Sequence, residues 1–104
     1  MSVGVLGAGA FGTALAISLG QAAPVLLWAR DARQAQQMQR SRVNTARLPG
    51  FEILAPVTVT SNLTDLDDCD ALLLAVPAQK LRAFLRGASG HFVGKTLVAC
   101  CKGE

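Results

Sequence analysis

Three glycines near the amino terminus stand at the spacing G-x-G-x-x-G, in the segment Gly7-Ala8-Gly9-Ala10-Phe11-Gly12. Gly7 allows a sharp turn out of a strand, Gly9 leaves the backbone open to a ligand, and Gly12 lets a helix pack closely. The N-terminus of a helix offers free N–H groups and a positive dipole end to an anion. We therefore predict that Gly7, Gly9 and Gly12 bind the pyrophosphate of a dinucleotide.

Arg30 follows the second apolar run of the chain, about 20 residues beyond Gly9, where this class of site usually carries an acid. An arginine cannot accept a hydrogen bond from a ribose 2′-hydroxyl, but it can pair with a 2′-phosphate. The sequence thus favours NADP over NAD as the cofactor. Arg33 and Arg47 could add charge to the same pocket. We expect Arg40 and Arg42 to be solvated surface residues.

Two later strand ends also carry candidate site residues, because ligands lie at the carboxyl ends of the strands in such sheets. Val76 and Pro77 end the most apolar run and are expected to line the nicotinamide side. Lys102 follows the last run, where its ammonium could hold a substrate phosphate or polarise an oxygen.

Other reactive residue types do not form a recognisable site. The three cysteines, Cys69, Cys100 and Cys101, lack C-x-x-C spacing, and His91 is the one histidine, so we predict no metal site. The cysteines are expected to be free and buried, and His91 and the acidic run 65–70 to lie on the surface.

These residues must be positioned by alternating strands and helices. We predict strands at 3–6, 25–29, 57–60, 71–76 and 96–100, and helical segments at 11–21, 31–42, 63–69 and 79–86. The segment 44–56 is expected to be irregular. Apolar strands alternating with helices predict an α/β fold, a Rossmann-type doubly wound, mainly parallel sheet with helices on both faces. Residues 1–104 would form one dinucleotide-binding domain.

The chain has 104 residues, a net charge of +3 and 51% hydrophobic residues. We expect no signal peptide and no membrane span, and hence a cytoplasmic protein. The arginine-rich window lacks interleaved aromatics or a docking motif, so nucleic acid is not an expected partner.

Several segments resemble the N-terminal domain of bacterial NAD(P)-dependent glycerol-3-phosphate dehydrogenase along the whole chain. They are the glycine segment continued to Ala16, then Leu27-Trp28-Ala29-Arg30-Asp31, Leu48-Pro49-Gly50, Leu74-Ala75-Val76-Pro77 and Cys100-Cys101-Lys102-Gly103-Glu104. The glycine motif and the Ala-Val-Pro turn occur in many dehydrogenases, whereas the other three segments are more particular to this family.

The resemblance implies hydride transfer between sn-glycerol 3-phosphate and dihydroxyacetone phosphate with NAD(P)(H), feeding glycerophospholipid synthesis in a homodimer. It places Ala10, Phe11, Arg30 and Arg47 against the cofactor, and Lys102 against both cofactor and substrate. This chain has Ala10-Phe11 where the family usually has Ser-Trp, which removes one hydroxyl but keeps an aromatic ring. The family often has an aromatic residue at the position of Arg47.

The family's catalytic lysine belongs to a helical second domain, so we assign no catalytic residue within 1–104 and expect weak dinucleotide binding without turnover. Two alternatives stay open at this point. One is the cofactor domain of another β-hydroxy acid or ketopantoate-type dehydrogenase. The other is a non-catalytic dinucleotide-sensing module.

Overall fold

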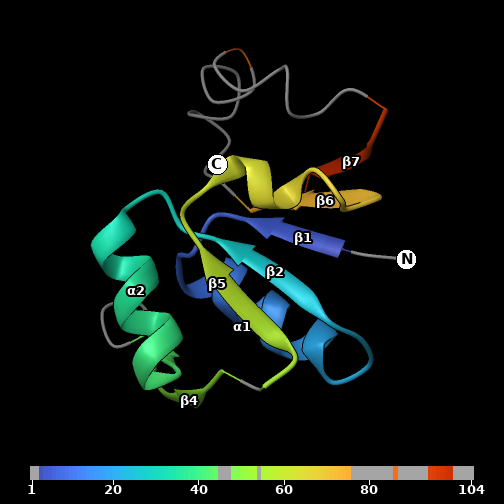
Figure 1. Cartoon of the computed structure of the whole chain (residues 1–104). Coiled ribbons are helices and arrows are strands. Elements are labelled where there is room, and N and C mark those ends of the chain that lie inside the picture. The colour runs from blue at the N-terminus through green and yellow to red at the C-terminus, as the bar shows by residue number, and fades with distance from the viewer. Residues whose placement is uncertain (1–2, 45–47, 54, 76–85, 87–93, 100–104) are drawn as a thin grey trace.

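The computed structural model describes residues 3–44, 48–53, 55–75, 86 and 94–99 (Figure 1). In chain order the elements are β1 (Val3–Leu6), α1 (Ala10–Gly20), β2 (Val25–Trp28), α2 (Ala32–Ser41), β3 (Val43–Asn44), β4 (Leu48–Glu52), β5 (Val57–Thr60), the 3₁₀ helix η1 (Leu63–Leu66), β6 (Ala71–Leu74) and β7 (Thr96–Ala99).

Five strands form one sheet in the order β5-β2-β1-β6-β7, and every neighbouring pair is parallel. The chain builds outward from β1 to β2 and β5, then returns to the other side of β1 to add β6 and β7. This reversal is the doubly wound arrangement, in which the crevice at the strands' carboxyl ends binds ligands. The predicted α/β class and parallel sheet are confirmed.

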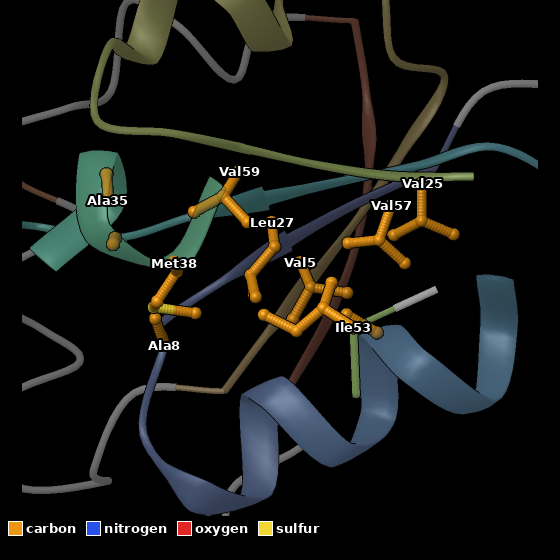
Figure 2. Close-up of a cluster of buried hydrophobic side chains, with 11 residues drawn as sticks. Val5, Ala8, Val25, Leu27, Ala35, Met38, Ile53, Val57 and Val59 are labelled. Atoms are coloured by element: carbon orange, nitrogen blue, oxygen red, sulfur yellow. The ribbon is translucent and has the colours of Figure 1, made fainter. Parts of the chain in front are cut away.

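Successive side chains along the strands point to opposite faces of the sheet and pack in two separate hydrophobic cores. On one face, Val5, Leu27 and Val57 pack with residues of α1 and α2, and Ile53 joins them (Figure 2). On the other face, Leu6 and Trp28 join a cluster that includes Leu66 of η1. The strands β1, β2 and β6 are apolar along their whole length because side chains on both faces of the sheet are buried.

The predicted strands all exist, and two of them, β2 and β6, end one or two residues earlier than expected, while Cys100 at the expected end of β7 lies outside the described residues. Helix α1 agrees to within one residue, and α2 ends at Ser41. The segment 63–69 contains a single short 3₁₀ helix. The predicted helix 79–86 and His91 lie outside the described residues, apart from Arg86.

The expectation of irregular structure over 44–56 was wrong. Here β3 and β4 pair antiparallel as a two-stranded sheet with a register shift at Val43 and Asn44. Pro49 lies within β4, which is compatible with a strand at the edge of a sheet. The pattern was misleading because a bulged two-stranded ribbon has no regular apolar alternation.

The expectation that Arg42 is a solvated surface residue was also wrong. Arg42 ends α2 in the left-handed conformation, with φ 61°, and is half-buried. Its guanidinium donates to the carbonyl oxygens of Ile53 and Val57 and to Oε1 of Gln39. Arg42 therefore joins α2 to the segment before β5, whereas Arg40 is exposed as expected.

Other surface and core expectations agree with the structure. Asp65, Asp67, Asp68 and Asp70 are exposed, and Cys69 is a buried free thiol. Cys100 and Cys101 lie outside the described residues. In the described part of the chain, no helix has the length and apolar character needed to cross a membrane, and no cluster of three potential metal ligands occurs.

Candidate dinucleotide site

The glycine turn, residues 7–12, begins where β1 ends. Gly7 has φ 111°, a conformation that side chains with a Cβ rarely adopt, and its N–H donates to the carbonyl oxygen of Trp28 at 3.0 Å. This bond continues the pairing of β1 and β2 by one residue while the chain turns away from the sheet. Gly7 therefore makes the turn out of the strand that the sequence predicts.

Gly12 lies in the first turn of α1 and packs directly on the start of the glycine turn. A Cβ at Gly12 would stand 1.7 Å from the carbonyl oxygen of Gly7 and 3.3 Å from the Cβ of Ala75. Ala75 in turn donates its N–H to Leu6 at 2.8 Å, so the end of β6 lies beside the same turn. The absence of a side chain at Gly12 is what lets the helix start so close to the strands.

Gly9 is the N-cap of α1 and faces open space. Apart from its neighbours in the chain, no atom of the described residues lies within 4 Å of the position that its Cβ would occupy, and its carbonyl accepts from the N–H of Thr13 at 2.9 Å. No side chain in the described part of the chain caps α1, and the first turn of this helix contains no acidic residue. The N–H groups at this end of the helix and the positive end of its dipole can therefore bind an anion from outside the helix.

Ala10 and Phe11 form the exposed start of α1. Phe11 is 44% accessible to solvent, which is unusual for a phenylalanine. The ring lies on the helical turn that the glycine segment opens, so an apolar surface adjoins the free N–H groups. A bound dinucleotide could cover this ring.

Arg30 stands one residue beyond the last backbone contact between the ends of β2 and β5, in which Ala29 donates to Thr60 at 2.8 Å. Its side chain is exposed, as is that of Arg33. Because the strands are parallel, their carboxyl ends meet at one edge, and Arg30 shares that edge with the glycine turn. Arg40 lines a shallow groove between α2 and β5 whose lining includes no residue of the turn.

The structure thus brings six of the predicted site residues to one edge of the sheet: Gly7, Gly9, Ala10, Phe11, Gly12 and Arg30. The other four, Arg47, Val76, Pro77 and Lys102, lie outside the described residues. Their assignment to the site stays a prediction.

Two polar residues near the turn were missed by sequence reasoning. Thr13 and Asn44 are completely buried, and the Asn44 amide contacts both Thr13 and the carbonyl of Ala8. No sequence signal pointed to this contact, because Asn44 stands 31 residues from Thr13, in a segment expected to be irregular. A polar residue buried at such a place becomes visible only when the hairpin is folded against α1.

The family model of the NAD-dependent glycerol-3-phosphate dehydrogenase N-terminus matches residues 2–104. This chain belongs to that family. A glycerol-3-phosphate dehydrogenase [NAD(P)+] of Roseobacter denitrificans is 74% identical over 103 residues, which are 99% of this chain and 32% of the relative. The corresponding protein of Ruegeria is 54% identical over 103 residues, with 99% and 32% covered.

Solved structures agree with the family assignment. The glycerol-3-phosphate dehydrogenase of Coxiella burnetii superposes with a TM-score of 0.89 at 26% sequence identity, covering 98% of this chain and 32% of that one. The chain therefore spans about a third of the length of the glycerol-3-phosphate dehydrogenases that it matches. The comparisons do not favour the alternative dehydrogenases or a sensing module.

Proposed function

We propose that this glycerol-3-phosphate dehydrogenase domain binds NAD(P)(H) with the pyrophosphate at the N-terminus of α1. The observation that carries the proposal is the uncapped, open helix start at Gly9, between the close contacts of Gly7 and Gly12. A Cβ at Gly9 would meet no atom of the described residues beyond its neighbours in the chain, which leaves room there for a ligand. An anion there gains the free N–H groups and the helix dipole.

The cofactor preferred by this domain is NADP(H). Arg30 is exposed at the shared strand edge, where an acid would hold a 2′-hydroxyl, and its guanidinium can pair with a 2′-phosphate. Arg33, also exposed, supplies a second positive charge in the following turn. The glycine turn itself does not distinguish the two dinucleotides, because both carry the same pyrophosphate.

As part of a longer protein, the domain takes part in the interconversion of sn-glycerol 3-phosphate and dihydroxyacetone phosphate, the reaction for which its relatives are named. The bound nicotinamide supplies or accepts the hydride. The chain orients it: Val76 and Pro77 are the predicted contacts on the nicotinamide side, Arg47 adds charge to the adenosine pocket, and Lys102 holds the substrate phosphate. We expect a homodimer that serves glycerophospholipid synthesis in the cytoplasm.

Binding is tested by titrating the chain separately with NADPH and NADH and following Trp28 fluorescence or the heat of binding. We expect saturable binding of both, with NADPH tighter. ATP serves as the control for simple attraction of phosphates to a positively charged chain. Absence of saturation by either dinucleotide, or equal binding of ATP, would contradict the proposed site.

The proposed substrate is tested in a chimera. This chain replaces the matching 103 residues of the Roseobacter denitrificans relative, which is 74% identical there. We expect oxidation of NADPH that depends on dihydroxyacetone phosphate, with oxaloacetate and ketopantoate as control substrates. A folded chimera that binds NADPH but does not reduce dihydroxyacetone phosphate would overturn the substrate assignment and leave the cofactor site standing.

A further inference from the structure

One buried side chain, Asn44, attaches the β3–β4 hairpin to the glycine turn. Its Nδ2 donates to the carbonyl oxygen of Ala8 at 2.8 Å and to Oγ1 of Thr13 at 2.9 Å. Asn44 and Thr13 are both 0% accessible to solvent. Leaving such acceptors without a donor in the interior is costly, so the amide holds both neighbours in one geometry.

The bond to Ala8 also sets the direction of the next backbone N–H. No described peptide bond is cis, so the Ala8–Gly9 peptide is trans. In a planar trans peptide, the carbonyl oxygen and the following N–H point in opposite directions. Because the Ala8 oxygen points inward to the buried Asn44 amide, the Gly9 N–H points outward from the turn.

We propose that Asn44 is a positioning residue for the dinucleotide, holding the Ala8–Gly9 peptide so that the Gly9 N–H faces the pyrophosphate before binding. The inference rests on the proposed function of the glycine turn. A donor that is already oriented does not have to be ordered when the ligand arrives, so more of its interaction energy is retained as affinity. The hairpin, absent from the sequence-based expectation, thereby contributes to cofactor binding without touching the cofactor.

The first test compares two variants that each remove a buried contact. Asn44→Ala frees the Ala8 carbonyl, whereas Leu66→Ala opens a cavity in the core on the opposite face of the sheet. We expect both to lower the melting temperature. Among folded molecules, Asn44→Ala should weaken NADPH binding at least about tenfold, the effect of losing roughly one hydrogen bond to a charged group. Leu66→Ala should leave the dissociation constant within about twofold, because Leu66 lies in the core on the other face of the sheet and makes no hydrogen bond to the turn within the described part of the chain.

The second test uses Asn44→Asp, which keeps the size of the side chain. An ionised carboxylate has no proton for the Ala8 oxygen and brings negative charge behind the turn, so NADPH affinity should be low. Desolvation raises the pKa of a buried carboxyl, and the protonated form can donate to Ala8 again. Affinity should therefore recover as the pH is lowered, by a larger factor than in the wild type. If Asn44 had a purely structural role, lowering the pH would restore the stability of Asn44→Asp without restoring the NADPH affinity of its folded molecules.

A measurement on the unchanged chain completes the design. The backbone amide resonance of Gly9 should exchange rapidly with water in the free chain and should shift and become protected on adding NADPH. The proposal is overturned if that resonance does not respond, if Asn44→Ala binds NADPH like the wild type, or if Leu66→Ala weakens binding equally. A wild type that binds no dinucleotide contradicts the proposed function itself, which is a distinct outcome.

Discussion

The two α-helices of the domain begin in opposite ways. Asp31 caps α2 and accepts the N–H of Arg33 at 2.8 Å. Gly9 stands at the same position of α1 and contributes no side chain at all. Both helices pack on the same face of the sheet, and both start at the carboxyl edge of a parallel strand.

The difference shows how the same backbone geometry can serve stability or binding. A helix start whose N-cap side chain accepts one of the free N–H groups, as Asp31 does in α2, gains about 1 kcal/mol from the cap. A helix start that leaves them free gives up that gain and keeps a place for an anion. The start of α1 is nevertheless held from the inner side, by the close packing at Gly12 and by the hydrogen bond from Asn44 to Ala8.

The largest expected effect comes from adding one methyl group to the inner side of α1. Gly12→Ala should destabilise the domain by about 3 kcal/mol or more, because the new Cβ would overlap the Gly7 carbonyl. Chemical denaturation measures the change. Gly9→Ala is the matched control, with the same added atom in open space, and should lose no more than about 1 kcal/mol. Equal losses in the two variants would contradict the close packing at Gly12.

Gly9→Asp gives α1 the cap that α2 already has. We expect stability to be retained or to rise by up to about 1 kcal/mol, since Asp is a favoured N-cap and suits the dipole. NADPH binding should fall at least about tenfold, because a carboxylate then occupies the place of the pyrophosphate. Gly9→Asn separates the two causes, as it caps without a charge and should weaken binding less. Unchanged NADPH affinity in Gly9→Asp would place the dinucleotide elsewhere.

Arg30→Glu changes selectivity rather than the anchoring of the pyrophosphate. The ratio of NADPH to NADH affinity should fall about tenfold or more, because a pair with a phosphate is replaced by repulsion and a carboxylate can accept from a 2′-hydroxyl. Arg40→Glu makes the same change of charge on an exposed residue of α2 and should leave the ratio nearly constant. If both variants shift the ratio alike, Arg30 acts only through overall charge.

Removal of the α2 cap should affect stability alone. Asp31→Ala should cost about 1 kcal/mol, the usual value for losing an N-cap side chain, and Asp31→Asn should restore most of it. The free energy of unfolding is measured in urea. NADPH affinity should not fall in either variant. A loss of affinity in Asp31→Ala comparable with that of Gly9→Asp would remove the distinction between the two helix starts.

The smallest expected effect is a change in the pH dependence of stability on replacing Cys69, which lies in the core on the face of the sheet opposite α1 and α2. Burial raises the pKa of its thiol, while Lys95 lowers it and Asp68 and Asp70 raise it further. The protonated Cys69 thiol thus contributes fully to stability below the pKa of the thiol in the unfolded chain. This contribution is lost as the pH rises through the higher pKa of the folded protein. Stability of Cys69→Ala should depend less on alkaline pH than that of the wild type. NADPH binding should be unaffected by this substitution. If the stability of Cys69→Ala and that of the wild type changed in the same way with alkaline pH, the raised pKa of the Cys69 thiol would be contradicted.

Much of the fold followed from local patterns. The strand at 57–60 and the beginnings of the other sheet strands were predicted because short apolar runs between turn residues are strong signals. The β3–β4 hairpin was not predicted, since two short strands with Pro49 and a register shift have no regular period. The predicted part of the site was similarly local: the glycine spacing and Arg30 could be recognised within segments of a few residues.

The sequence by itself determined the family, the glycine turn and the positions of Gly7, Gly9, Gly12 and Arg30, because each depends on neighbours along the chain. Only the tertiary structure decided that Gly12 packs closely against the Gly7 carbonyl and that the space beside Gly9 is open in the described part of the chain. It also decided that Asn44 is buried behind the turn and that Arg42 joins α2 to the segment before β5. Such contacts link residues 11 to 36 positions apart, and they exist only when the sheet brings those segments together.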